Sequence, residues 1–424
     1  MASELTNEAV ATAIADRESE WLDVLVELIR TPSENPPGDT TEIAASFTDL
    51  LDDRGVPYEV IAPQAAMPNV LAQFDGGLGD PEEGPHLTFN GHLDTFEATG
   101  GDRWDYDPFG GEIDDGKVYG RGSADMHAGF TASLAAFLYL FENRDRLPGR
   151  VTFAAVSDEE TGGKWGTEYL VENHPEYTGD VVLNGEPSTN DVIRFGERGP
   201  IWMEIAVRGQ AAHISTLEEK ESAVEILADV IHDLTRREDL ADRYEIPEKV
   251  ETAILEAEDA MDGALGAGAT DRVLRPDRNF GVIEGGEKAN LVAEHARAEL
   301  DVRMPVGAST DDARAWVEDA IADYPGEIEV TTLLQQDPTW SDYEHPIFQH
   351  LQGAAGEVRG EEPKFSCSLG GSDCRFYRFE GVPCAVYGPT PYNIGSENEH
   401  VYVEDFVEVA QAQAMAAAAY LQGA

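Results

Sequence analysis

The chain has 424 residues, more than a single hydrophobic core usually organises, so we expect two domains and not a small binding module. It carries 29 lysines and arginines against 83 aspartates and glutamates, which gives a formal net charge of −54 at pH 7. This charge argues against nucleic acid as a partner. Because concentrated salt screens the repulsion between carboxylates, the charge also predicts a halophilic protein from a salt-adapted organism.

Cysteine usage and the N-terminal segment indicate a cellular location. The three cysteines, Cys367, Cys374 and Cys384, form no Cys-X-X-Cys motif, and their odd number fits a reducing compartment. Segment 1–21 is polar and acidic, and no stretch reaches the roughly 18 apolar residues that a membrane span requires. We therefore expect a cytoplasmic protein that does not bind membranes.

The first half of the chain alternates helices with short apolar runs. An amphipathic helix around Trp21–Ile29 ends at the proline-rich segment 31–38, and a later helix, Gly129–Phe141, is apolar on most faces. Five apolar runs are predicted to be buried strands: Asn69–Phe74, His86–Asn90, Val151–Val156, Val181–Asn184 and Cys384–Tyr387. This order predicts an α/β fold with a mostly parallel sheet flanked by helices.

Residues 199–337 have a different pattern. The predicted elements are strand Ile201–Val207, helix Ser222–Leu234, strands Asn279–Glu284 and Ala293–Arg303, helix Thr310–Asp323 and strand Glu327–Leu334. This order builds a four-stranded sheet with two helices on one face, and the acidic, Ala/Gly-rich segment 236–276 is an insertion to which we assign no role. Because the α/β pattern then returns, we predict a larger domain of 1–198 and 338–424 that carries the inserted domain 199–337.

Potential metal ligands follow several of the predicted strands. In open α/β sheets, ligands bind beyond the carboxyl ends of the strands. Imidazole nitrogens and carboxylate oxygens are donors that a pair of zinc ions accepts. The candidates are His92 and Asp94 after the second run, Glu159 and Glu160 after the third, Glu186 after the fourth, His400 after the fifth, and Asp125 before the apolar helix.

These segments resemble the two-zinc deacylase and carboxypeptidase family, which includes acetylornithine deacetylase, succinyl-diaminopimelate desuccinylase and glutamate carboxypeptidase. The resemblance rests on Gly91–Thr95, Gly120–His127, Asp158–Glu160, Asn184–Pro187, Asp301–Arg303 and a histidine before the final helix. Together these motifs are specific, although each alone is weak. The resemblance implies a zinc-exopeptidase-like catalytic domain and an inserted α+β domain that serves as a lid and forms a homodimer.

The resemblance also implies a site with two Zn²⁺ per subunit, for which Co²⁺ or Mn²⁺ could substitute. His92, Asp125 and Glu186 would hold one ion, and Asp125, Glu160 and His400 would hold the other.

Two neighbouring acidic residues would complete this centre. Glu159 would act as the general base, and Asp94 would accept a hydrogen bond from His92 that fixes its ring.

Further residues would bind the substrate. His213 of the inserted domain would reach the partner subunit's site and stabilise the oxyanion. Asn290 and Arg303 resemble the pair that binds a substrate carboxylate, although Arg303 could also form a structural ion pair. Ser372 and Arg375 lie in a segment similar to a substrate loop of desuccinylases, one residue shorter here. Asp373 and Arg375 could instead cap a helix and form an ordinary ion pair on its surface.

The sequence therefore predicts a metal-dependent amidohydrolase for an N-acyl amino acid or short peptide. A deacetylase or desuccinylase of arginine or lysine biosynthesis is the first hypothesis, and a carboxypeptidase or dipeptidase with the same site is the second. The third is a metal-holding or peptide-binding homologue without catalysis. Glu159 argues against the third, because a protein that only binds would need the ligands but not the base.

Overall fold

The computed structural model describes residues 4–215 and 221–423, which form two compact units. The first unit contains the chain up to Phe195, Ser341–Ser366 and the segment from Ser372 to the C-terminus. The second contains Gly196–Trp340 and Cys367–Gly371. The chain therefore leaves the first unit twice, once for the long segment Gly196–Trp340 and once for the short segment Cys367–Gly371.

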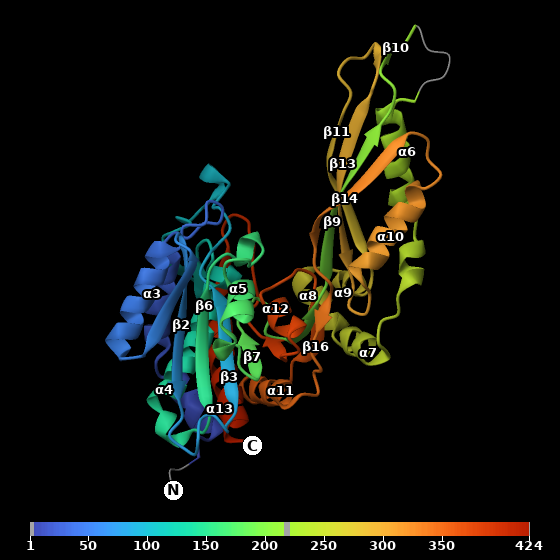
Figure 1. Cartoon of the computed structure of the whole chain (residues 1–424). Coiled ribbons are helices and arrows are strands. Elements are labelled where there is room, and N and C mark those ends of the chain that lie inside the picture. The colour runs from blue at the N-terminus through green and yellow to red at the C-terminus, as the bar shows by residue number, and fades with distance from the viewer. Residues whose placement is uncertain (1–3, 216–220, 424) are drawn as a thin grey trace. The chain divides into compact units, whose positions relative to one another are not determined.

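The first unit is built on a mixed sheet (Figure 1). The strands at its centre, β6, β3, β7 and β17, are parallel, whereas β1 and β2 at one margin and β8 at the other are antiparallel to their neighbours. The predicted α/β class is confirmed, and the parallel pairing is confined to the middle of the sheet. In spatial order the strands are β1 (Tyr58–Gln64), β2 (Met67–Asp75), β6 (Arg150–Val156), β3 (His86–His92), β7 (Val181–Asn184), β17 (Cys384–Val386) and β8 (Val192–Glu197), and β16 (Lys364–Ser368) also pairs with β8.

Helices cover both faces of this sheet. Phe153 of β6 packs against aromatic rings of α3 and α4 on one face, while the next residue, Ala154, packs against Leu170 of α5 on the other. Such burial on both faces explains why the central strands are continuous apolar runs in the sequence. The helices are α1 (Asn7–Ala15), α2 (Glu18–Arg30), α3 (Thr41–Arg54), α4 (Ala128–Glu142), α5 (Thr167–Asn173), α11 (Pro346–Arg359), α12 (Cys374–Phe379) and α13 (Val403–Gln422).

A small sheet adds loop segments to the first unit. Its strands are β18 (His400–Tyr402), β5 (Lys117–Tyr119) and β4 (Ile113–Asp114), with His400 opposite Tyr119. A short helical segment, η2 (Ser123–His127), follows β5 and leads into α4. The pairing of β18 with β5 thus places the predicted ligand His400 beside the segment that carries Asp125.

The second unit contains a four-stranded antiparallel sheet in the order β11-β13-β9-β14. Helices α6 and α10 pack on one face of it through a single core, and the predicted β-α-β-β-α-β order is confirmed. The elements are β9 (Gly199–Arg208), α6 (Ala223–Arg236), β11 (Asp277–Gly285), β13 (His295–Met304), α10 (Thr310–Ile321) and β14 (Glu327–Gln335).

Short elements complete the second unit. Strand β10 (Ala212–His213) pairs with β12 (Leu291–Val292), and β15 (Thr339–Trp340) pairs with the last residues of β8. The Ala/Gly-rich insertion forms a 3-10 helix, η6 (Asp239–Arg243), and the helices α7 (Glu248–Glu256), α8 (Glu258–Leu265) and α9 (Ala269–Leu274). Over the ranges 4–215 and 221–423, no helix combines the length and the apolar character that crossing a bilayer requires.

Candidate metal centre and active site

The parallel strands at the centre of the first sheet end at a cluster of metal-ligand side chains. His92 is the last residue of β3, Glu160 follows β6, and Glu186 follows β7. His92 Nε2 lies 3.2 Å from Asp125 Oδ1 and 3.2 Å from Glu186 Oε1. One ligand atom from each of His92, Asp125 and Glu160 lies within 4.8 Å of the other two. The sheet therefore brings together four of the five predicted metal ligands.

The ring of His92 is fixed by the backbone of Asp94. Nδ1 of the ring donates a hydrogen bond of 2.8 Å to the Asp94 carbonyl, while the Asp94 carboxylate lies 3.7 Å from Nδ1. The acceptor that we expected in the carboxylate is thus the carbonyl of the same residue. The carboxylate instead accepts the backbone N–H groups of Glu159 at 3.2 Å and Glu160 at 3.1 Å, together with the side-chain amide of Asn35 at 2.9 Å. Asp94 therefore orients both His92 and the turn that follows β6.

The charges of the cluster fit a bound cation. Burial and the neighbouring Asp125 carboxylate raise the pKa of Glu160 to about 11, and the same two causes raise the pKa of Glu186. Burial opposes the charged form of His92, but hydrogen bonds to Asp125 and Glu186 outweigh it and raise its pKa well above the usual value. Glu160 Oε1 is buried and makes no hydrogen bond within the described part of the chain. These carboxylates need a cation to stay ionised together, and one nitrogen among several oxygens suits zinc or a similar ion.

Glu159 lies beside the cluster and faces an arginine. Its side chain is 13% exposed, and Arg375 Nη1 lies 3.6 Å from its Oε1 atom. Burial and the Glu186 carboxylate raise the pKa of Glu159 well above its usual range, whereas His92 and Arg375 act to lower it. A carboxylate in this position can accept a proton from a molecule bound at the cluster.

Arg375 is buried beside Glu159 and is not exposed on a helix surface, as the alternative interpretation would require. The residue is 5% exposed, and its guanidinium donates hydrogen bonds to the carbonyls of Ser372 at 2.7 Å and Gly162 at 3.1 Å. Ser372, itself 6% exposed, also accepts the backbone N–H of Cys374 through its hydroxyl at 3.3 Å. Arg375 therefore lies against the turn that carries Glu159.

His400 is held in a separate pocket of aromatic rings. Its Nδ1 donates a hydrogen bond of 2.9 Å to the Asn398 carbonyl, and its ring stacks on Tyr392 at a centroid distance of 5.1 Å. The centroid of the Tyr119 ring lies 4.9 Å from that of the His400 ring. Among the described residues, the group with all ligand atoms within 4.8 Å of one another does not include His400. His400 thus has the orientation of a ligand but stands outside the tightest cluster.

The remaining predicted site residues belong to the second unit. His213 and Asn290 are brought together, because the Asn290 amide donates a hydrogen bond of 3.1 Å to His213 Nε2. The ring of His213 is exposed, and its Nδ1 lies 2.7 Å from the Ser215 hydroxyl. Arg303 forms an ion pair of 3.0 Å with Asp301, as the alternative interpretation proposed. Within this unit, His213 and Asn290 form a pair, and Arg303 has its own carboxylate partner.

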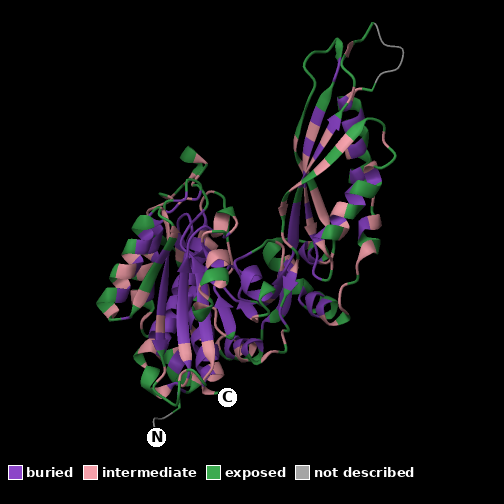
Figure 2. Cartoon of the chain, in the orientation of Figure 1, coloured by how far each residue is buried: buried purple, intermediate pink, exposed green. Residues whose placement is uncertain are grey.

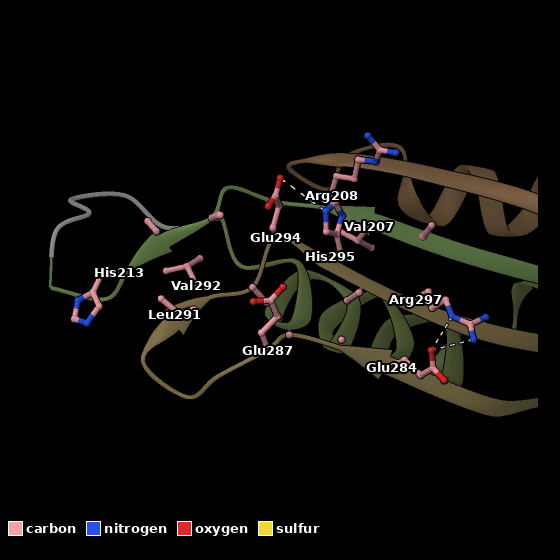
Figure 3. A pocket seen from close by; sticks show the side chains of 17 residues that line it. Val207, Arg208, His213, Glu284, Glu287, Leu291, Val292, Glu294, His295 and Arg297 are labelled. Carbon is pink, nitrogen blue, oxygen red and sulfur yellow. Dashed lines mark hydrogen bonds and ion pairs between the residues drawn. The ribbon is translucent and has the colours of Figure 1, made fainter.

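A pocket of about 730 Å³ lies around the end of the second unit's sheet. In Figure 3, His213, Leu291 and Val292 stand at one end of its lining, and Glu284 and Arg297 stand at the other. The lining mixes both signs of charge with small apolar residues. Its ionisable members are Arg208, His213, Glu284, Glu287, Glu294, His295 and Arg297.

The model of one protein family matches most of the chain. The model described as peptidase family M20/M25/M40 matches residues 88–419, a range that contains every residue we predict for the site. The chain belongs to this family. It is therefore a metallohydrolase of the M20 type, and the cluster at the ends of β3, β6 and β7 is its candidate metal centre.

Individual relatives are distant in sequence but similar over most of their length. Succinyl-diaminopimelate desuccinylase of a Caulobacter species is 26% identical over 348 residues, which are 77% of this chain and 79% of the relative. The M20 metallo-carboxypeptidase of Sulfolobus solfataricus has a TM-score of 0.78 at 20% identity, with 95% of this chain and 99% of that chain covered. A dinuclear metal binding M20 peptidase of Bacillus subtilis has a TM-score of 0.64 at 16% identity, with coverages of 96% and 99%. The two structures support the fold, and the desuccinylase supports the class of amide hydrolases.

Several residues of this M20 site were missed in the sequence. Asn35, Arg121 and Glu399 are buried polar residues that bond to the segments of the predicted ligands. Asp373 is 1% exposed, neither of its carboxylate oxygens makes a hydrogen bond of normal geometry to a residue that the structure describes, and burial raises its pKa to about 7. Arg121 carried a signal as a charged residue among the glycines of 120–127, and Asp373 was considered with Arg375 as a helix cap or a substrate contact. Asn35 and Glu399 stand in polar segments without a pattern that marks them.

Proposed function

We propose that this M20 enzyme hydrolyses the amide bond of an N-acyl amino acid, with Glu159 as the general base. The observation that carries the proposal is the half-buried Glu159 next to three convergent ligand side chains, with Arg375 against it. A protein that only binds metal needs the ligands but gains nothing from an additional carboxylate at this position. The desuccinylase relative supports an acyl group that ends in a carboxylate.

The residues assigned to the metal ions follow from the donor set and the family resemblance. His92, Asp125 and Glu186 would hold one ion, and Asp125, Glu160 and His400 would hold the other, with Zn²⁺ as the proposed metal. When bound, two such ions polarise the scissile carbonyl group and lower the pKa of a water molecule.

The chain's own groups then move the protons and orient the reactants. Glu159 takes a proton from the attacking water and later delivers it to the leaving nitrogen. The enzyme therefore neither gains nor loses a proton over the whole reaction. Asp94 keeps the Glu159 turn in place through the two N–H groups that its carboxylate accepts.

The second unit supplies the proposed substrate contacts. His213, oriented by Asn290, would stabilise the oxyanion in the partner subunit of a homodimer. Asn290 and Arg303 would bind the substrate's carboxylate. Ser372 and Arg375 of the first unit are further proposed substrate contacts.

A peptidase with the same centre is the second candidate. The fold similarity to a metallo-carboxypeptidase favours it, because that protein has a similar architecture over almost its entire length. The two functions differ in what stands on the carbonyl side of the scissile bond, an acyl group or an amino acid residue. Substrate measurements therefore have to separate them.

The deciding experiment measures free amine released from N-succinyl amino acids, N-acetyl amino acids and dipeptides. The assay is run in molar KCl with added zinc, with added cobalt, and after removal of metal by a chelator. We expect metal-dependent hydrolysis of N-acyl amino acids, with dipeptides at least tenfold slower in kcat/KM. Preference for dipeptides would select the peptidase. No hydrolysis of any substrate by a protein that contains two ions would refute the proposal.

A further inference from the structure

A buried ion pair links the segments that carry two predicted ligands of the first unit. Arg121 is 1% exposed and Glu399 is 0% exposed, and their side chains form a direct ion pair. Removing both charges from water is costly, so such a pair is a poor source of stability by itself. The other contacts of the two side chains indicate what the pair does.

Glu399 connects the backbone of Asp125 to His400. Its Oε1 atom accepts the backbone N–H groups of Ala124 at 2.9 Å and Asp125 at 3.2 Å. Its carbonyl accepts the N–H of Gly120 at 3.0 Å, and the residue that follows it in the chain is His400. A shift of Glu399 would therefore move two of the three ligands that we assign to the second ion, Asp125 and His400.

Arg121 connects Glu399 to two further loops. One nitrogen of its guanidinium, Nη2, donates hydrogen bonds to the carbonyls of Glu97 at 3.3 Å and Gly395 at 3.2 Å. The Glu97 loop follows β3, which ends at His92, and Gly395 precedes His400 in the chain. The guanidinium also lies over the ring of Trp104, 5.4 Å from its centroid. One buried cation thus contacts the loops of both predicted histidine ligands.

We propose that Arg121 and Glu399 are positioning residues that set the spacing of Asp125 and His400, and with it the affinity for the second metal ion. The inference rests on the metal ligands of the proposed function. The pair acts through the backbone of its neighbours and touches neither ion nor substrate. Coordination distances tolerate deviations of only about 0.2 Å, so a loosened link weakens binding before it unfolds the domain.

The test separates this role from a merely structural one. The double variant Arg121→Met/Glu399→Leu replaces the pair by apolar side chains of similar size, a change that often preserves stability. Co²⁺ binding to the metal-free protein is measured by calorimetry and by the visible absorption of the bound ion. We expect the affinity for one of the two ions to fall roughly 10- to 100-fold.

Two further variants control for folding. Glu399→Gln keeps an oxygen that can accept the Asp125 N–H, so we expect a smaller loss of Co²⁺ affinity than in the double variant. Arg198→Met is the matched control, because Arg198 is also a buried arginine bonded to backbone carbonyls and one carboxylate, all within the second unit. It should lower the unfolding midpoint and leave Co²⁺ affinity unchanged.

The outcomes divide clearly. The inference would be overturned if the double variant folds and binds Co²⁺ as tightly as the wild type, or if Arg198→Met loses as much Co²⁺ affinity as the double variant. A wild-type protein that binds fewer than two ions would also overturn it. If the double variant does not fold, Glu399→Gln decides: a lowered unfolding midpoint with wild-type Co²⁺ affinity would overturn the inference. A wild type that binds two ions but hydrolyses no amide would refute the proposed function alone, because the affinity comparison does not depend on turnover.

Discussion

The sheets of the two units differ in how many of their faces are covered. In β6 of the first sheet, successive residues are equally buried, with Phe153 0% and Ala154 1% exposed. In β9 of the second sheet, burial alternates, with Met203 0% and Trp202 44% exposed (Figure 2). A sheet buried on both faces has room for ionisable groups only at its strand ends, which is where the candidate metal centre lies. A sheet with one open face carries charges along its whole length.

The largest expected effect concerns the strand ends of the first sheet. Glu159→Gln should lower kcat by roughly 100- to 10,000-fold, because the amide cannot take a proton from the attacking water. The amount of bound metal, measured by elemental analysis, should stay at two ions per chain. Glu172→Gln, an exposed change on α5, is the matched control and should keep full activity. Full activity of Glu159→Gln with both ions bound would refute the proposed mechanism.

Truncation of one aromatic residue in each sheet tests the difference in coverage directly. Phe153→Ala should reduce the free energy of unfolding by roughly 3–5 kcal/mol, because Phe153 contacts rings from β3, α3 and α4. Trp202→Ala removes a side chain from the open face and should cost less than about 1 kcal/mol. Chemical denaturation of both variants gives the two values. Equal losses would show that the open face of the second sheet is covered in solution.

Lowering the pH tests the burial of His86, the first residue of β3. Burial, aided by the charge of Arg150, lowers the pKa of His86 to about 4, below the value near 6.5 of an unfolded histidine. Between these values the unfolded chain binds more protons, so stability falls as the pH drops from about 6.5 to 4. The shift corresponds to a loss of about 3 kcal/mol. In His86→Gln, the unfolding free energies at pH 7 and pH 4.5 should differ by less than in the wild type, and an unchanged difference would contradict this assignment.

The smallest effect concerns a charge cluster on the open face of the second sheet. Arg297 lies 2.8 Å from Glu299, 2.9 Å from Glu204 and 3.0 Å from Glu284. Arg297→Ala should lower the unfolding midpoint slightly in dilute buffer, because the three carboxylates then repel one another. In molar KCl the difference from the wild type should shrink, while the wild type itself should become more stable because of its charge of −54. A wild-type midpoint that does not change with KCl would refute the predicted salt adaptation.

The elements of the fold were predictable where burial determines the sequence pattern. The apolar runs at Val151–Val156 and Val181–Asn184 correspond to strands buried on both faces. Strand β1 was missed because most of its residues are exposed or half-buried, so it shows no apolar run. Strand direction was also not predictable at the margins of the sheet. Pairing of β1 with β2 depends on a tight connection between them and not on side-chain hydrophobicity.

The ligand-type residues of the site were predictable, and most of their supports were not. His92 and Glu186 stand directly after buried strands, a position that the sequence reveals. The contact of Arg375 with Glu159 joins residues more than 200 positions apart, and no local pattern encodes it. The same holds for the pair of Arg121 and Glu399. Tertiary packing alone brings these partners together.

His92 and His400 share a tether that consists of main chain. In each case Nδ1 donates to the carbonyl of a residue two positions away in the sequence, Asp94 in one and Asn398 in the other. Both rings therefore carry a proton on Nδ1 and turn Nε2 away from this carbonyl, and Nε2 of His92 faces the carboxylates of Asp125 and Glu186. A carbonyl acceptor does not depend on the chemistry of its own side chain, so at Asn398 the backbone conformation, with a φ of 56° in the left-handed region, keeps the acceptor in place. An insertion or deletion between 398 and 400 would separate the ring from its acceptor, whereas a substitution at 398 would act on this hydrogen bond only through that conformation.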